Sequence, residues 1–156
     1  MSVIIPNCFD SHVHWQATGE FKSRWDLSFL KNESDILIDP PKFISLKGDW
    51  LLGRAWDHNS WGIKKYPSRK TLDQLPHRGP MVLSRVDAHA VWMNTEALRV
   101  LDLIDENGFP KNELKKFAHE VPLDDDGKVL GTLIDDPANV VIEKLPKSSR
   151  ADVRQY

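Results

Sequence analysis

Short apolar segments alternate with amphipathic ones along the whole chain, and this alternation is the feature that most limits its fold. Residues 3–9 (VIIPNCF), 49–57 (DWLLGRAWD) and 79–94 (GPMVLSRVDAHAVWMN) are rich in β-branched and aromatic residues, as strands are. Stretches with helical spacing lie between and after them. The sequence therefore predicts a mixed α/β fold.

Two kinds of signal predict helices: the spacing of apolar residues and the presence of capping residues. Phe21, Trp25 and Phe29 are spaced by four and predict one helix within residues 19–34. Ser68 is the expected N-cap of a short helix, and Asn94 that of a helix over residues 94–104.

The last quarter of the chain combines turn and helix signals. Residues 123–136 contain an Asp-Gly turn and predict either a hairpin or a strand that follows the turn. Residues 136–156 begin a helix that Pro146 interrupts.

Composition excludes several classes of protein. The chain has 156 residues, the size of one ordinary domain, and its net charge of −2 includes no block of like charge, so neither nucleic acid nor a membrane is expected as a partner. Its only cysteine, Cys8, excludes an internal disulfide framework and fits the reducing cytoplasm. We expect a cytoplasmic protein whose six tryptophans serve a core or an aromatic-walled pocket.

Two histidines follow the first apolar segment in the sequence Phe-Asp-Ser-His-Val-His-Trp. On a strand, His12 and His14 point to the same face, and imidazole is a common ligand of zinc and other transition metals. Asp10 has the same spacing and could orient a ligating histidine. A catalytic zinc site usually needs about three protein ligands, so the pair alone is a weak signal for metal and favours two hydrogen-bonded histidines at a strand end. The other histidines form no local ligand set: His58, His77, His89 and His119.

The complete set of motifs resembles the amidohydrolase superfamily, and within it the branch called amidohydrolase family 3, which includes N-substituted formamide deformylase-like hydrolases. The similarity rests on residues 9–15, 48–62 (GDWLLGRAWDHNSWG), 66–98 (YPSRKTLDQLPHRGPMVLSRVDAHAVWMNTEAL) and 124–136 (DDDGKVLGTLIDD), in that order. It covers about residues 3 to 145.

The resemblance implies a (β/α)8 barrel with metals at the carboxyl ends of its strands. Residues 1–19 would supply the first barrel strand, residues 20–145 a mixed α/β insertion that lies over the active site, and residues 146–156 the start of the next barrel helix. It also implies that a lysine, two histidines and an aspartate of the complete site lie outside this chain, which we expect to be a catalytically incomplete piece.

The resemblance further assigns roles to individual residues. His12 and His14 would bind a divalent metal, most simply one or two zinc ions. Trp56, Asp57 and His89 would line the substrate pocket, although a core position for Trp56 and a capping role for Asp57 are equally open. The residues expected to support these groups are Asp10, Arg85 and Asp87.

Several positions depart from the family pattern. Asn7, Ala55 and Ala88 stand where the family has glycine, and residues 109–122 do not match its glycine-rich stretch. These changes leave the substrate undefined.

The expected function is hydrolysis of a carbon–nitrogen bond of a small molecule by a metal-activated water. The protein partner would be either a second copy of the chain or the remainder of the barrel. One alternative is a non-catalytic interaction module made of the insertion. Another is an unrelated small metal-binding protein that uses His12, His14 and one further histidine.

Overall fold

The computed structural model describes residues 19, 22, 24–38, 40 and 49–146. The predicted strand at residues 3–9 lies outside them. The elements in chain order are β1 (Trp25–Asp26), η1 (Glu33–Leu37), β2 (Leu51–Trp56), η2 (His58–Ser60), α2 (Arg69–Leu72), β3 (Met81–Arg85), β4 (Ala90–Met93), α3 (Thr95–Val100), α4 (Asn112–Lys115), β5 (Thr132–Ile134) and α5 (Asp136–Lys144).

The strands form one mixed sheet in the order β1-β2-β3-β4-β5. β1, β2 and β3 are parallel, whereas β4 is antiparallel to both β3 and β5. It follows that β5 runs in the same direction as the first three strands. The predicted α/β class is confirmed, while the predicted barrel is not tested by the described residues.

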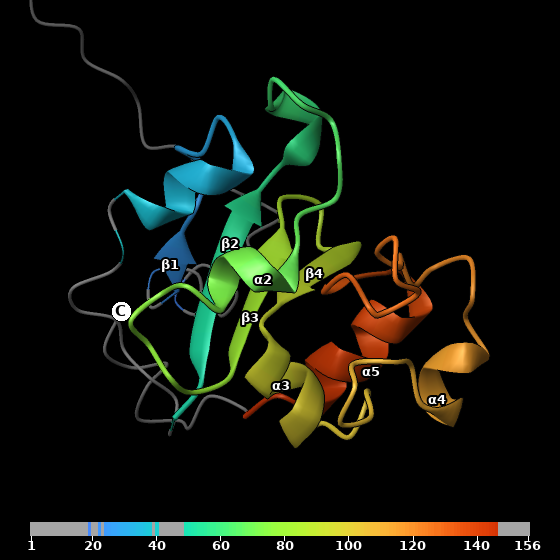
Figure 1. The fold of residues 1–156 in the computed structure, drawn as a ribbon. Helices are drawn as coiled ribbons and strands as arrows, with labels where there is room; N and C mark the ends of the chain where they lie inside the picture. Colours follow the sequence, from blue (N-terminus) through green and yellow to red (C-terminus); the bar gives the residue numbers. More distant parts are fainter. Residues whose placement is uncertain (1–18, 20–21, 23, 39, 41–48, 147–156) are drawn as a thin grey trace, which may run out of the picture.

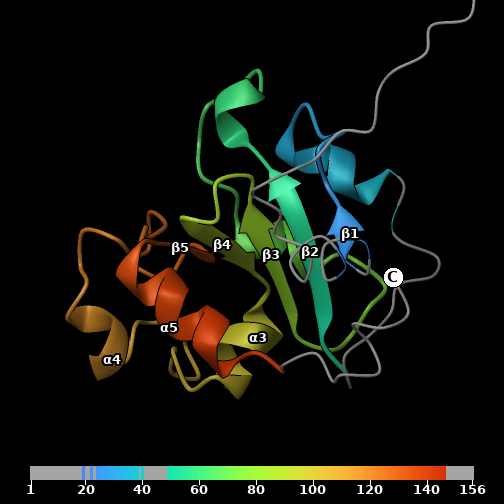
Figure 2. The same cartoon turned by 180° about the vertical axis from the view of Figure 1, so that it is seen from behind.

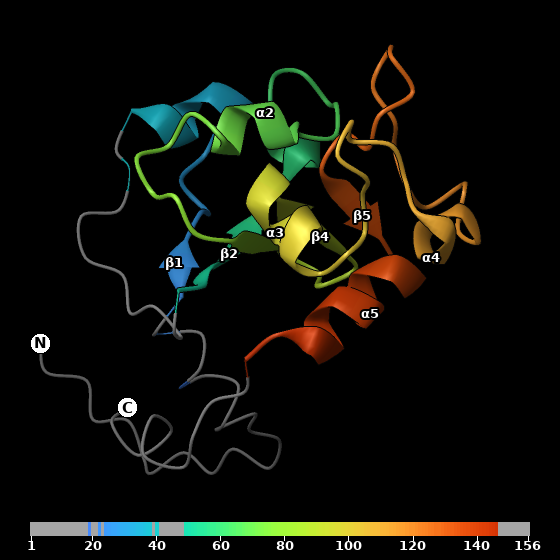
Figure 3. The same ribbon diagram turned by 60° about the horizontal axis from the view of Figure 1, so that its bottom comes forward.

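Both faces of the sheet are covered. This is required because successive apolar side chains of β3 point to opposite faces. Met81 and Leu83 point into a core that also contains residues of η1 and α2, whereas Val82 points into the opposite core with residues of α3, α4 and α5. Figures 1 and 2 show α2 in front of the sheet in one view and α5 in front in the other, and Figure 3 shows the sheet between these two helices. Both cores are built from side chains that are almost completely buried.

The predicted caps are confirmed. The Ser68 hydroxyl accepts a hydrogen bond from the backbone N–H of Lys70, and the Asn94 side chain accepts one from Ala97. Asn94 does more than cap, because its Oδ1 also accepts from Met81 N (2.9 Å) and its Nδ2 donates to the Gly79 carbonyl. It therefore ties the start of α3 to the start of β3. α5 begins with Pro137 in its first turn and ends before Pro146, as expected.

Two predictions of secondary structure are wrong. Trp25 and Asp26 pair with β2 as a strand, so the helix expected across this segment is not formed there. Burial explains the difference, since Leu27 and Leu30 are buried while Phe29 of the supposed helical stripe is 49% exposed. The long apolar run of residues 79–94 is not one strand either, because a turn over residues 86–89 divides it into β3 and β4.

Candidate functional site

The carboxyl ends of β2, β3 and β5 meet at one edge of the sheet. Asp57 directly follows β2, Arg85 ends β3, and Asp135 directly follows β5. The turn from β3 to β4 adds Asp87 and His89. We call these five residues the carboxyl edge. In open α/β sheets, ligands bind outside the carboxyl ends of parallel strands, so this edge is the first place to look for a site.

Backbone strain is concentrated at the same edge. Ala55, Ala88 and Asp135 have φ values of 68°, 63° and 50°, and they are three of the four non-glycine residues with positive φ in the described part of the chain. Ala55 forms the irregularity between Arg54 and Trp56 in the pairing of β2 with β3. Strain of this kind persists where the surrounding structure enforces it, often at functional sites.

The turn between β3 and β4 is closed by an ion pair. Arg85 donates from Nε and Nη2 to the two carboxylate oxygens of Asp87, both at 2.8 Å, and the backbone N–H of His89 donates to Asp87 Oδ1 (3.0 Å). The hydrogen bonds from Arg85 hold the pKa of Asp87 below its usual value, and Asp87 in turn raises the pKa of Arg85. The predicted supporting role of Arg85 and Asp87 fits this geometry, because their pair fixes the backbone that carries His89.

His89 and Asp135 form the most exposed polar pair of the edge. His89 Nδ1 lies 3.0 Å from Asp135 Oδ1, and the backbone N–H of Asp135 donates to the His89 carbonyl (2.8 Å). A carboxylate only accepts, so Nδ1 of His89 donates in this pair, and in the uncharged form of the ring Nε2 is left as an acceptor. The His89 side chain is 69% exposed, so Nε2 is accessible to a ligand. Asp135 could not be predicted from the sequence, since nothing in its spacing relates it to His89.

The other two predicted pocket residues are placed differently from His89. Trp56 is completely buried, and its Nε1 donates to the Leu83 carbonyl of β3 (2.7 Å). Asp57 caps η2 by accepting from Asn59 N (3.0 Å). The structure therefore places Trp56 in the core below the edge and Asp57 at its rim, and their contact with a substrate stays a prediction.

His58 is a residue of interest that sequence spacing did not reveal. It is 7% exposed, its ring centroid lies 4.5 Å from that of Tyr66, and no described residue forms a hydrogen bond with its Nδ1. Burial, followed by the nearby positive charge of Arg85, lowers its pKa. The surroundings of His58 therefore disfavour its charged form, and its ring contacts Trp56 below the edge.

The predicted metal ligands His12 and His14, together with Asp10, lie outside the described residues. Within the described ranges, no group of three or more His, Cys, Asp or Glu side chains is arranged to hold a metal ion. Nor does this part of the chain contain a helix long and apolar enough to cross a membrane.

Comparison with known proteins extends these observations. A putative amidohydrolase, YtcJ of Bacillus subtilis (strain 168), is 28% identical over 151 residues, which are 96% of this chain and 27% of that protein. The protein LONG AFTER FAR-RED 3 of Arabidopsis thaliana is 27% identical over 104 residues, 65% of this chain and 18% of its own length. The chain thus spans about a quarter or less of the curated relatives it matches.

Two solved structures have a similar fold. An uncharacterized metal-dependent hydrolase from Pyrococcus furiosus superposes with a TM-score of 0.58 and 21% identity over 95% of this chain and 27% of its own. An uncharacterized metal-dependent hydrolase from Pyrococcus horikoshii OT3 superposes with a TM-score of 0.55 and 22% identity. The match covers 86% of this chain and 24% of that one. The model of the amidohydrolase family itself matches residues 3–156. This chain belongs to the amidohydrolase family.

Proposed function

We propose that the chain is part of a metal-dependent hydrolase that cleaves a carbon–nitrogen bond, with an N-substituted formamide or a related amide as the substrate class. Family membership and the His12-x-His14 motif support this proposal. The observation that carries it is the carboxyl edge, where an accessible imidazole is held by Asp135 and by the Arg85–Asp87 turn. We further propose a (β/α)8 barrel to which residues 20–145 are an insertion, and a cytoplasmic location.

The metal would be held by residues outside the described ranges. A divalent ion such as zinc, held by His12 and His14 with ligands from elsewhere in the protein, would supply an activated water and polarise the carbonyl. The described residues would supply substrate contacts from the carboxyl edge. His89 Nε2 accepts a hydrogen bond from the amide N–H of the substrate, and Asp135 keeps the imidazole in the tautomer that can accept it.

The test is hydrolysis of N-substituted formamides by the full-length protein, followed as release of amine and formate. His89→Ala should lower kcat/KM by about tenfold to a hundredfold, the effect of losing one substrate hydrogen bond. Asp135→Asn should give a smaller loss, because the ring remains but is no longer oriented by a carboxylate. His119→Ala is the matched control, since His119 is also exposed and, among the described residues, no hydrogen bond joins it to the five residues of the carboxyl edge.

Activity of His89→Ala equal to that of His119→Ala would remove His89 from the substrate site. Hydrolysis of the corresponding formate esters but not of the amides would contradict the assignment to carbon–nitrogen bonds.

An interaction module without catalysis is the second candidate. It is motivated by exposed apolar side chains, since Ile38, Ile63 and Val86 are each more than 60% exposed. This candidate predicts no turnover of any amide by the metal-loaded full-length protein, so the same assay separates the two.

A further inference from the structure

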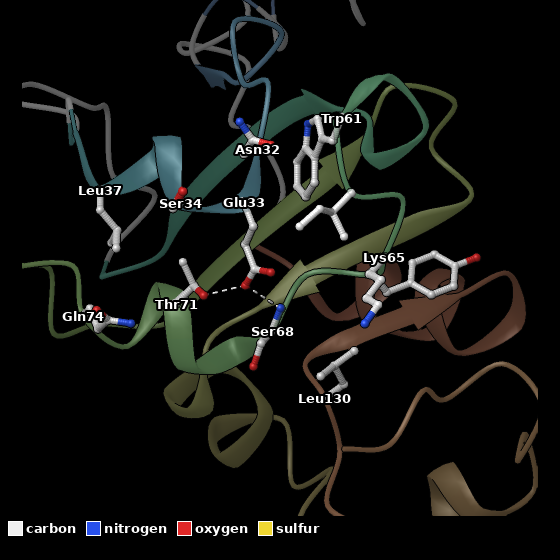
Figure 4. A pocket seen from close by; sticks show the side chains of 12 residues that line it. Asn32, Glu33, Ser34, Leu37, Trp61, Lys65, Ser68, Thr71, Gln74 and Leu130 are labelled. Carbon is white, nitrogen blue, oxygen red and sulfur yellow. Dashed lines mark hydrogen bonds between the residues drawn. The ribbon is translucent and has the colours of Figure 1, made fainter. Parts of the chain in front are cut away.

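A cavity of about 630 Å³ lies apart from the carboxyl edge, on the face of the sheet covered by α2. Figure 4 shows its walls, which come from η1, from the loop between η2 and α2, and from α2 itself. Leu130, far along the chain, closes one side. The volume falls within the range of about 300–1,000 Å³ that is usual for small-molecule sites.

The walls of the cavity are largely apolar. Trp61 is 3% exposed and contributes to the core beneath, with Leu37 and Tyr66 packed against the same core. Ile63 and Leu130 add further aliphatic surface. These side chains provide a surface on which an aromatic or branched aliphatic group is removed from water.

Glu33 brings a fixed negative charge into this apolar space. Its Oε1 accepts from the backbone N–H of Ser68 (2.8 Å) and from the Thr71 hydroxyl, as Figure 4 shows. Both hydrogen bonds use the same oxygen, and within the described ranges Oε2 has no hydrogen bond and no cation. In a carboxylate held in this way, one oxygen is hydrogen-bonded to the protein and the other can accept a hydrogen bond from a ligand.

Lys65 brings a positive charge to the same cavity from a different wall. It lies on the loop between η2 and α2, whereas Glu33 lies on η1. No ion pair joins Lys65 to Glu33, and neither pairs with another charged side chain among the described residues. The cavity thus presents one negative and one positive group that do not neutralise each other.

We propose that this cavity binds a small zwitterion, with an ammonium group and a carboxylate on one apolar body, as in an aromatic or branched amino acid. The ammonium group donates to Glu33 Oε2, and the carboxylate accepts from Lys65 Nζ. The apolar part packs on Trp61 and Tyr66. A simple cation or a simple anion would satisfy only one of the two charges, so each binds more weakly than the zwitterion.

Tyr66 makes the cavity a neighbour of the candidate active site without making it part of that site. Its ring lines the cavity and also stacks on His58 below the carboxyl edge. The proposal does not depend on the proposed hydrolysis, because it concerns binding and is tested by binding alone.

The experiment is calorimetric titration of the full-length protein with three probes of similar size: phenylalanine, 2-phenylethylamine and 3-phenylpropionate. Glu33→Gln keeps one oxygen that can accept from Ser68 and Thr71, and it replaces the charged Oε2 with an uncharged NH2 group that only donates. Lys65→Gln removes the other charge. Lys64→Gln and Glu106→Gln are the matched controls, since both residues are exposed and neither lines the cavity.

Phenylalanine should bind the wild-type protein more tightly than either singly charged probe. Each of the two cavity variants should weaken its Kd about tenfold or more, the effect expected from removing one charge-assisted hydrogen bond. Binding of 2-phenylethylamine should depend on Glu33 alone and binding of 3-phenylpropionate on Lys65 alone. The control variants should bind all three probes as the wild type does.

Three results would overturn the proposal. The first is no binding of phenylalanine at about 10 mM, well above the Kd of a specific metabolite site. The second is a phenylalanine Kd that only one of the two charge removals weakens, and the third is equal weakening by the controls. Thermal unfolding of each variant identifies any loss of phenylalanine binding that comes from a damaged fold. If a variant is damaged in this way, Lys65→Met decides the outcome, because Lys65 forms no hydrogen bond with α2.

Discussion

Two alanines occupy backbone positions that suit glycine better. The family pattern has glycine where this chain has Ala55 and Ala88, and the structure gives both alanines a positive φ. An L-residue in this region is strained by about 1–2 kcal/mol, because its Cβ lies close to the following carbonyl oxygen. The sequence therefore located these two unusual positions through the resemblance, and the structure supplies their physical reason.

Ala88→Gly should raise the free energy of unfolding by about 0.5–1 kcal/mol. Relief of the strain exceeds the entropy that glycine adds to the unfolded chain, which is about 0.4–1 kcal/mol. Chemical denaturation measures the change. Ala97→Gly within α3 should have the opposite sign, since Ala97 is helical and buried. Destabilisation by both substitutions would contradict the assigned backbone of Ala88.

Asp87 should make stability depend on pH. Its pKa is lowered in the folded protein from the usual 3.8, chiefly by the hydrogen bonds from Arg85. The stabilisation is therefore complete above the unfolded pKa and is lost as the pH falls through the folded value. Asp87→Asn should cost less than about 1 kcal/mol at pH 7, since the pair is partly exposed, and the difference from wild type should shrink below about pH 4.

Urea denaturation at several pH values measures this effect. The exposed Asp125, which forms no ion pair within the described residues, gives the control Asp125→Asn, whose difference from wild type should stay near zero. A deficit of Asp87→Asn that grew on acidification would contradict the sign of the shift.

At the scale of elements, the caps and the last helix could be predicted from the sequence, and β1 could not. Ser68, Asn94 and Pro137 act through local hydrogen bonds and fixed backbone angles, which a short stretch of sequence encodes. The segment around Trp25 becomes a strand only because β2 lies beside it, and this long-range pairing overrides the helical spacing. The pairing of His89 with Asp135 was hidden for the same reason, since it joins residues 46 positions apart.

The start of β5 depends on a close approach between two elements. Gly131 has φ +118°, and a Cβ added there would lie 2.6 Å from the backbone nitrogen of Arg69 in α2. Backbone atoms cannot move aside cheaply, so Gly131→Ala should destabilise the protein by about 3 kcal/mol or more through combined strain and overpacking.

Gly127 is the matched control for this prediction. Its φ of +76° is also positive, but the nearest atom to an added Cβ is 3.8 Å away. Gly127→Ala should therefore cost only about 1 kcal/mol, the strain alone. Thermal or chemical unfolding measures both variants. Equal costs would show that the contact between β5 and α2 is not as close as described.

At the scale of the whole molecule, the sheet brings together groups that are distant in sequence. β2, β3 and β5 run in the same direction, so Asp57, Arg85 and Asp135 reach one edge although the chain separates them widely. The α/β class could be predicted from the alternation of apolar and amphipathic segments, because the spacing of apolar residues differs between strands and helices. The strand order and the side chains that meet at the edge could not, because they depend on tertiary pairing.

We propose that this edge forms one wall of a metal-dependent hydrolytic site whose metal is held by His12 and His14. The most direct test is the metal content of the full-length protein, measured by elemental analysis for the wild type and for His12→Ala and His14→Ala, with His119→Ala as the control. We predict that the wild type and the control retain a divalent metal in a whole-number ratio to protein, and that both other variants lose metal. Full metal content in His12→Ala and His14→Ala would show that these two histidines do not hold the metal.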